Sequence, residues 1–187
     1  MEPVQRKRLK EEADIPKSDV KQLLVKCAEA LSENKIETFN MLVQEAQGVV
    51  SITANGAIAE ALRNEDRIHI IDFQIAQGTQ WITLIQALAA RPQGLPHVRI
   101  TGIDDPVSEY ARGDNLDLVG KMLSEMSKKF NIPLEFNALP VYGPKVSRDM
   151  LDIRPGEALA VNFTLQLHHT PDESVDVNNP RDGLLRW

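Results

Sequence analysis

The sequence of 187 residues has one cysteine, an excess of acidic over basic residues, and no long hydrophobic run. The single cysteine, Cys27, excludes an internal disulfide and suits a reducing compartment. Because no stretch approaches the roughly 18 consecutive apolar residues of a membrane-spanning helix, we expect no membrane association. The formal net charge of -6 argues against broad electrostatic binding of nucleic acid. A local basic patch around Lys121, Lys128 and Lys129 stays open as an exception.

Motifs that carry catalysis or hold metals are also missing. The sequence contains no phosphate-binding P-loop, no H-E-x-x-H zinc motif and no G-x-S-x-G nucleophile turn. His168 and His169 are neighbours in a segment predicted to be extended, so their side chains point to opposite faces. One cysteine offers no zinc-binding set. We therefore predict a protein that is not an enzyme and that holds neither a metal nor a cofactor.

The amino-terminal part of the chain divides into a leader and a helical region. Residues 1–17 are polar and predict a flexible leader, in which Arg6–Lys10 is either a nuclear import signal or a solvated terminus. Residues 18–64 predict a cap of three short helices, with the second helix ending at Gly48 and the third covering Ala54–Leu62. The apolar stripe of the first helix consists of Val20, Leu23, Leu24, Cys27 and Leu31.

Residues 65–187 differ in pattern, because strands rich in β-branched residues now alternate with helices. The predicted strands are Arg67–Phe73, His97–Ile103, Leu134–Leu139 and Ala158–Leu165. One helix follows the first strand and ends near Arg91, and another covers 114–130 with Leu116 and Leu123 on its apolar stripe. This alternation, with right-handed crossovers, predicts an α/β fold with a doubly wound, Rossmann-like parallel sheet.

The turn after the first strand lies where Rossmann-like folds bind a nucleotide or cofactor. Such sites use glycines after strand one and an acidic residue after strand two. The candidate pocket residues here are Asp72, Gln77, Gly78 and Asp104. Only one glycine is present, and Ile75 and Gln77 would crowd a nucleotide. Three alternatives remain: a small-molecule pocket, a polar docking or nucleic-acid contact, and a structural turn in which Asp72 supports the next helix.

Several long stretches of this sequence resemble the GRAS family of plant transcriptional regulators. The family's VHIID motif is matched by Ile68, His69, Ile70, Ile71 and Asp72, with isoleucine for the leading valine. The stretches FQIAQGTQW and HVRITGIDDP are also similar to the family. Residues 149–165 and 166–186 are similar to its scarecrow-like, phytochrome-A-signalling branch. Together the similar stretches cover most of residues 20–186.

The resemblance implies a nuclear regulator of transcription, with the cytoplasm as a second location and light or stress as its signals. It would bind DNA-bound transcription factors and other GRAS proteins, as a homodimer or heterodimer, so that its contact with DNA is indirect. The implied fold is a methyltransferase-like Rossmann core with a helical cap. Leucine-rich interaction helices are implied at residues 20–50 and 116–130. Their interaction residues are Leu23, Leu24, Leu31, Leu116 and Leu123.

Two other functions compete with this one: methyltransferase-like binding or catalysis with a small molecule, and direct sequence-specific binding of DNA. The sequence also departs from the family pattern in two places. Gln47–Ile52 runs directly into 53–57, so we expect an internal segment of the cap to be missing. The chain stops at Trp187, before the family's PFYRE and SAW regions. We therefore expect an incomplete cap, an incomplete sheet with an uncovered edge, and marginal stability.

Overall fold

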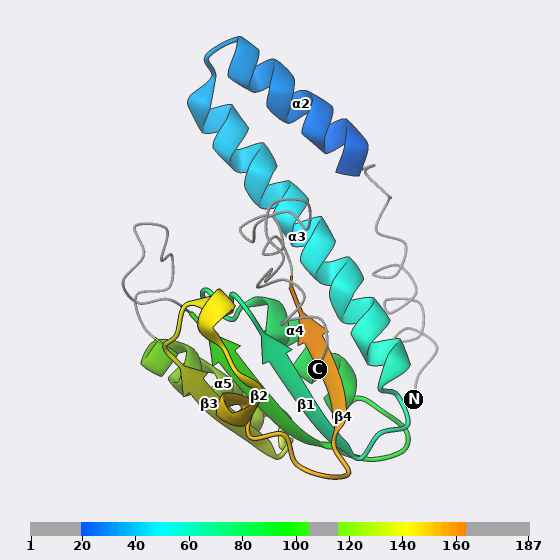
Figure 1. The fold of residues 1–187 in the computed structure, drawn as a ribbon. Coiled ribbons are helices and arrows are strands. Elements are labelled where there is room, and N and C mark those ends of the chain that lie inside the picture. The colour runs from blue at the N-terminus through cyan, green and yellow to red at the C-terminus, as the bar shows by residue number, and fades with distance from the viewer. Residues whose placement is uncertain (1–19, 105–115, 164–187) are drawn as a thin grey trace. The chain divides into compact units, whose positions relative to one another are not determined.

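The computed structural model describes residues 20–104 and 116–163, and the statements below concern these residues (Figure 1). The expected leader at 1–17 and the pair His168 and His169 lie outside the described residues. In chain order, the elements are α2 (Val20–Ser32), α3 (Ile36–Ala61), β1 (Arg67–Asp72), α4 (Gln80–Ala89), β2 (His97–Ile103), α5 (Leu116–Phe130), β3 (Leu134–Leu139), the 3-10 turns η1 (Gly143–Lys145) and η2 (Arg148–Leu151), and β4 (Ala158–Asn162).

The described residues divide into two compact units, with the boundary between Ala54 and Asn55. In the first unit, α2 buries one stripe of small and apolar side chains, namely Leu23, Cys27 and Ala30. The helix ends where Asn34 takes a left-handed conformation, with φ of 55°, and the amide of Lys35 donates to the carbonyl of Ala30 at 2.8 Å. Cys27 is therefore a buried core residue of this unit, as its place on the stripe predicted.

The predicted helix break at Gly48 is wrong, because α3 runs through it without interruption. A glycine inside a helix costs only about 1 kcal/mol relative to alanine, which continued apolar spacing can offset. That spacing is kept across the glycine at intervals of four residues, by Ala46, Val50, Ala54, Ile58 and Leu62. The second and third predicted helices are thus one helix, and the boundary between the two units falls inside it.

The second unit is built on a parallel sheet with the strand order β3-β2-β1-β4. The register pairs Ile70 of β1 with Ile100 of β2 and with Ala160 of β4. The strand β4 was predicted to reach Leu165, but it ends at Asn162, and residues beyond 163 are not described. The order and direction of the strands confirm the predicted α/β, Rossmann-like class.

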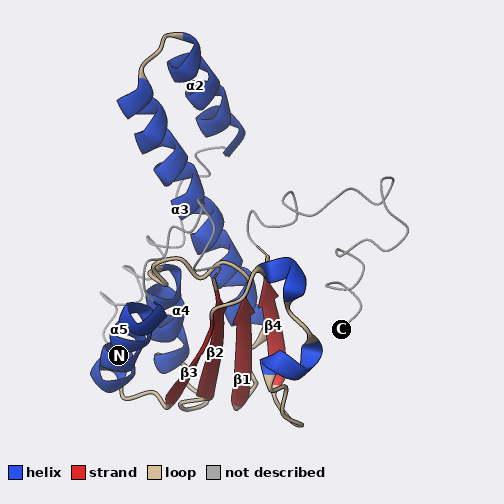
Figure 2. Cartoon of the chain, turned by 60° about the vertical axis from the view of Figure 1, so that its left-hand side comes forward, coloured by secondary structure: helices blue, strands red, loops and turns tan. Residues whose placement is uncertain are grey.

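The sheet separates two layers (Figures 1 and 2). The helices α4 and α5 cover one face and enclose the main core, in which Trp81, Leu84 and Leu123 are buried against Ile70 and Ile100. The crossover from β3 to β4 covers the other face with η1 and η2, so that the chain winds on both sides of the sheet. In the part of the chain that the structure describes, no helix has both the length and the apolar character needed to cross a membrane.

Candidate functional site at the carboxyl edge of the sheet

The carboxylate of Asp72 is held by three hydrogen bonds at the carboxyl end of β1. The indole Nε1 of Trp81 in α4 donates to its Oδ2 at 2.8 Å. The side-chain amide of Asn162 in β4 and the backbone amide of Gln74 both donate to its Oδ1 at 3.1 Å. Asp72 thus connects β1, α4 and β4, and the structure agrees with the interpretation in which this side chain supports the adjacent helix.

Burial raises the pKa of Asp72 from 3.8 to about 6. The three donated hydrogen bonds act in the opposite direction, because they favour the ionised form, and the charge of Asp104 adds a smaller increase. Asp104 itself is buried at the carboxyl end of β2. Near neutral pH, Asp72 is therefore a buried carboxylate whose charge depends on its protein donors.

Gly78 is required by both the turn and the packing of α5. Its φ is +65°, a conformation that residues with a Cβ rarely adopt. A Cβ at this position would lie 2.8 Å from Cγ1 of Val119 in α5. The glycine therefore allows α5 to approach the turn. This packing accounts for a glycine at position 78 without any ligand.

The four candidate pocket residues differ in their exposure to solvent. Asp72, Gly78 and Asp104 are buried, whereas Gln77 is exposed at the tip of the turn. Between them, Ile75 is buried and its amide donates to the carbonyl of Ile103 at 3.3 Å. Among the described residues, no group of three or more His, Cys, Asp or Glu side chains could hold a metal ion.

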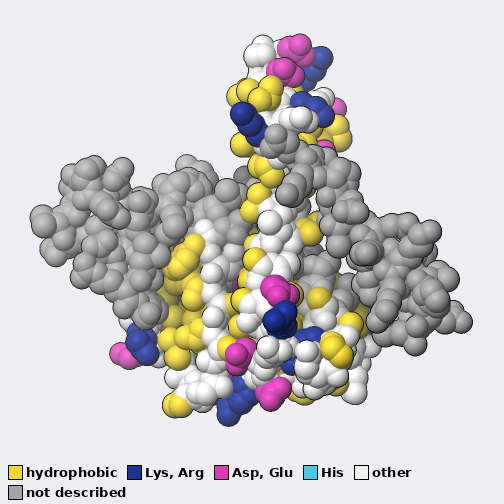
Figure 3. Space-filling view, turned by 90° about the vertical axis from the view of Figure 1, so that its right-hand side faces the viewer, with side chains coloured by type: hydrophobic (Ala, Val, Ile, Leu, Met, Phe, Trp, Pro, Cys, Tyr) yellow, Lys and Arg dark blue, Asp and Glu magenta, His cyan; other side chains and the backbone are white. Residues whose placement is uncertain are grey.

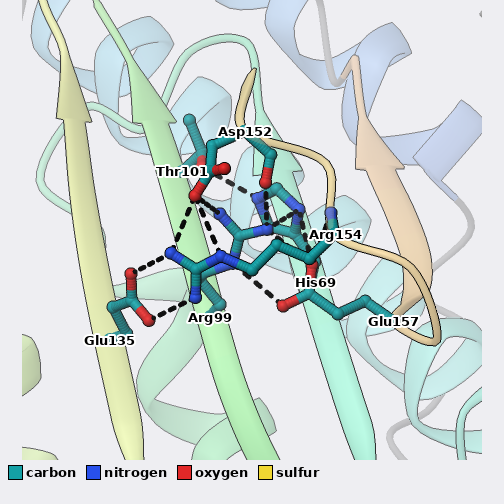
Figure 4. A network of polar contacts seen from close by, with 7 residues as sticks. All are labelled: His69, Arg99, Thr101, Glu135, Asp152, Arg154 and Glu157. Carbon is teal, nitrogen blue, oxygen red and sulfur yellow. Dashed lines mark hydrogen bonds and ion pairs between the residues drawn. The ribbon is translucent and has the colours of Figure 1, made fainter. Parts of the chain in front are cut away.

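A second polar cluster lies on the face of the sheet that is not covered by α4 and α5 (Figure 4). We call it the Arg99 network. It consists of His69, Arg99, Thr101, Glu135, Asp152, Arg154 and Glu157. Arg99 is 1% exposed, and its Nε and Nη2 donate to the two carboxylate oxygens of Glu157 at 3.1 and 2.5 Å. Its Nη1 and Nη2 also donate to the side chain and backbone carbonyl of Asp152 at 3.2 and 2.5 Å.

The outer part of the Arg99 network is formed by Arg154. Its two terminal nitrogens donate to the two carboxylate oxygens of Glu135 at 2.9 Å each, and its Nε donates to Asp152 at 2.9 Å. This hydrogen bond lowers the pKa of Glu135. Burial by itself would raise the pKa of Glu157, but the hydrogen bond and charge of Arg99 lower it below its usual value. The network fixes the segment that leads into β4.

His69 of the VHIID-like motif belongs to the same network and has no exposed surface. Its Nδ1 lies 3.1 Å from Nη2 of Arg99, and because a guanidinium only donates, Nδ1 must accept. Its Nε2 then carries the proton and donates to Oγ1 of Thr101 at 2.8 Å. Burial, followed by the charge of Arg99, lowers the pKa of His69 to about 4. His69 is therefore a neutral, hydrogen-bonded core histidine.

Sequence reasoning missed the Arg99 network as a whole. The available signal was a charged residue in the middle of a strand that otherwise reads as buried, HVRITGI. Such a residue requires a partner, because an unpaired buried charge is strongly unfavourable. The partners Asp152 and Glu157 are 53 and 58 residues away in sequence, so only the tertiary fold identifies them.

The predicted interaction residues fall into two groups. Leu24 and Leu31 of α2 are 58% and 54% exposed, so they are available to a partner. Leu23 and Leu123 are buried, Leu123 in the core beneath α5, and Leu116 is half-buried against that core. In the described fold, Leu23 and Leu123 are therefore packing residues and cannot make direct contact with a partner.

Comparison with known proteins gives consistent matches to one family. The profile of the GRAS domain family matches residues 48–187. The rice chitin-inducible gibberellin-responsive protein 1 is 57% identical over 96% of this chain and 42% of that protein. The scarecrow-like transcription factor PAT1 of Arabidopsis thaliana is 52% identical over 90% of this chain and 35% of that protein. The chain thus spans less than half the length of these relatives.

The match to the rice protein extends over 240 residues, more than the 187 of this chain, so the relative carries residues within the matched region that have no counterpart here. This agrees with an internally shortened chain. The crystal structure of the rice protein SCL7 superposes with a TM-score of 0.54 and 38% identity, covering 59% of this chain and 31% of that chain. The structural match supports the Rossmann-like assignment of the sheet.

Proposed function

Since this chain belongs to the GRAS domain family, we propose that it regulates transcription in plants through protein–protein contacts. The proposed partners are DNA-bound transcription factors, other GRAS proteins and a second copy of the chain. The proposed place of action is the nucleus, with the cytoplasm as a second location. The family match and the relative named as a transcription factor support this role.

The observation that carries the proposal is an exposed apolar stripe on α2. Leu24, Ala28 and Leu31 are all exposed and recur at helical spacing, beside the buried stripe that holds α2 in its own unit. Exposed leucines at this spacing favour helix-in-groove recognition, in which a partner covers one apolar helix face. The proposal therefore assigns the contact to Leu24 and Leu31, and not to the buried Leu23.

The signals to which the chain responds are the next part of the proposal. One relative is named for its response to chitin and gibberellin. We propose that this chain likewise acts downstream of light or stress signals, by binding or withholding a DNA-bound partner. A reporter gene under such a partner's control should change its output when the chain is co-expressed and the signal is applied.

The proposed role is regulatory rather than enzymatic. Among the described residues of the carboxyl edge, Asp72 has the carboxyl group with the strongly shifted pKa, and it accepts hydrogen bonds from three donors of the protein. Direct DNA binding is less favoured. The exposed Lys121, Lys128 and Lys129 of α5 share that helix with acidic residues, and the chain carries a net charge of -6. A steep loss of DNA binding with added salt would favour the direct mode instead.

The test is a quantitative pull-down of the full-length Arabidopsis relative and of a second, differently tagged copy of this chain. Replacing Leu24 and Leu31 together with asparagine should weaken capture by roughly tenfold or more, because central apolar contacts dominate binding energy. Leu95→Asn is the matched control, since Leu95 is 43% exposed and lies outside both of the implied interaction helices. Equal capture by the double variant and the control would contradict the proposed surface.

A further inference from the structure

We propose that residues 140–163, which we call the strap, open from the sheet as one unit while the rest of the Rossmann-like core stays folded. The strap contains η1, η2 and β4, and it crosses the face of the sheet that α4 and α5 leave uncovered (Figure 2). The Arg99 network is the latch that keeps the strap closed. This inference does not depend on the proposed regulatory role, because it concerns a different part of the molecule from α2.

The buried side chains of the strap lie outside the main core. Among the described residues, every buried member of the main core comes from the rest of the chain, and the strap adds only the small side chains of Ala158 and Ala160 at its border. Val146 and Leu151 of the strap belong to a separate, smaller cluster on the other face of the sheet. Opening the strap therefore breaks this smaller cluster and leaves the packing of α4 and α5 on the sheet in place.

The strand β4 relies on polar contacts, because little of its apolar surface is buried. Of its five residues only Asn162 is buried, whereas Leu159 and Val161 are 43% and 48% exposed. The side chain of Asn162 donates to Asp72 at 3.1 Å, which holds the end of the strand. The segment before β4 is held by the carboxylate of Glu157, whose side chain is 2% exposed and ion-paired within the latch. These contacts at its two ends supplement the backbone pairing of β4 with β1.

Figure 4 shows how the latch is built, with side chains of three adjacent strands meeting one short stretch of the strap, residues 152–157. Asp152 in this stretch has a φ of 46°, which is uncommon for residues other than glycine. Both its side chain and its backbone carbonyl accept hydrogen bonds from Arg99. Backbone conformations of this kind persist where the surrounding contacts over-determine them. The closed latch therefore holds Asp152 in this conformation, and release from Arg99 allows its backbone to relax.

The latch opens in one step because its members depend on each other. If Arg99 alone moved away, Glu157 would be left as a buried carboxylate without its partner, which is strongly unfavourable. Opening the whole strap instead exposes both groups to water. It also breaks the 3.1 Å hydrogen bond from the amide of Phe73 to the carbonyl of Asn162, and it leaves one edge of β1 unpaired. A free strand edge can pair with another extended chain, so the strap controls access to the strand that carries the VHIID-like motif.

The first experiment compares two amides of the whole chain by native-state hydrogen exchange, followed by NMR. The amide of Phe73 reports on the strap, because it donates to Asn162. The amide of Val98 reports on the remaining core, because it donates to the carbonyl of Pro133 at 2.9 Å. We expect the protection factor of Phe73 to be at least about tenfold lower than that of Val98. Equal protection of the two amides would overturn the proposal.

The second experiment weakens the main core without touching the strap. Ile85→Val removes one methyl group from a side chain of α4 that is 1% exposed in the main core. It should lower the protection factor of Val98 by about fivefold, because that amide exchanges only when the core unfolds. The protection factor of Phe73 should change by less than about twofold, because the core stays packed when the strap opens. An equal loss at both amides would show that the strap does not open separately.

The third experiment weakens the latch. Glu157→Gln should lower the protection factors of Phe73 and Val98 by the same factor, at least about tenfold, because the closed state from which both openings start loses its buried ion pair. Lys128→Gln removes an exposed charge of α5 as the matched control, and it should change neither value by more than about twofold.

Unchanged protection of Phe73 in Glu157→Gln would contradict the assignment of the Arg99 network as the latch. If this variant does not fold, Arg154→Gln, which removes only the outer part of the network, should act in the same direction by a smaller factor. The same protection of Phe73 in Arg154→Gln and Lys128→Gln would then overturn the assignment. None of these results depends on partner capture by α2.

Discussion

At the scale of single residues, β1 carries two buried titratable groups whose effects on stability have opposite signs. The folded pKa of Asp72 is raised to about 6, so its contribution to stability is greatest below about pH 4 and is lost as the pH rises to about 6. The folded pKa of His69 is lowered to about 4, so its contribution increases as the pH rises from about 4 toward 6.5. The two groups therefore offset each other across the same pH interval.

This opposition predicts the pH dependence of an Asp72→Asn variant. Without the titrating carboxyl group, the free energy of unfolding should increase more steeply between pH 4 and pH 6 than in the unsubstituted chain. Over this interval, the free energy of unfolding should rise by about 3 kcal/mol more in the variant than in the unsubstituted chain, because the pKa of Asp72 is shifted by about two units. Urea denaturation at several pH values measures it. Asp66→Asn, at an exposed position, is the control and should follow the unsubstituted chain.

At the scale of elements, α3 shows how little one glycine constrains a helix. Gly48 has no atom within 4 Å of the position where a Cβ would lie, so no packing requires a glycine there. Gly78 is the opposite case, since its positive φ and its contact with Val119 both exclude a side chain. The same residue type therefore carries different information at the two positions, and the sequence does not distinguish them.

The two glycines give a paired prediction. Gly48→Ala should raise the helix content and stabilise the chain by up to about 1 kcal/mol, through helix propensity alone. Gly78→Ala should destabilise it by about 2 kcal/mol or more, because strain and overpacking add. Circular dichroism during thermal unfolding measures both variants. A stabilising Gly78→Ala would show that α5 does not pack on the turn as described.

The strand β4 depends on contacts made at both of its ends. The Arg99 network holds the segment before it, and the hydrogen bond from Asn162 to Asp72 holds its end. Arg99→Met should therefore destabilise the fold by about 3–5 kcal/mol, because Glu157 would be left as a buried charge without its partner. The double variant Arg99→Met with Glu157→Met should recover part of this loss. Hydrogen exchange of the β4 amides would locate the effect, and unchanged exchange would contradict it.

At the scale of the whole sheet, β4 is an edge strand in the described structure, and its outer edge has no neighbouring strand there. Among the residues described, β4 pairs only with β1, and Leu159 and Val161 on its face opposite α4 are 43% and 48% exposed. Figure 3 views this side, where hydrophobic side chains gather at the surface. An apolar strand with a free edge favours pairing with another chain.

Self-association at this edge is therefore the prediction for the whole molecule. Val161→Lys should lower the average mass seen by light scattering at high protein concentration, because a charge on an edge strand opposes edge-to-edge pairing. Leu118→Lys adds the same charge at an exposed position of α5 and should not have this effect. If both variants reduce association equally, net charge and not the β4 edge is responsible.

The secondary-structure elements, the fold class and the family of this protein could largely be predicted from local sequence. The alternation of strands and helices predicted the parallel α/β sheet, and the bounds of β2 and β3 were predicted to the residue, because their β-branched and apolar patterns are strictly local signals. The long stretches around Ile68–Asp72 identified the family, and the family match confirmed it. The single glycine of the turn also indicated a weak cofactor site, since close approach of a backbone needs small residues.

Only the tertiary structure decided what the polar residues do. Asp72 meets Asn162 across 90 residues, and Arg99 meets Glu157 across 58, so no local pattern could have paired them. The structure also separated the exposed Leu24 from the buried Leu23, which are equivalent by composition and adjacent in sequence. Burial and long-range hydrogen bonding depend on which surfaces meet in the fold. The local pattern determined the elements, and their packing decided which residues stabilise and which remain free to bind.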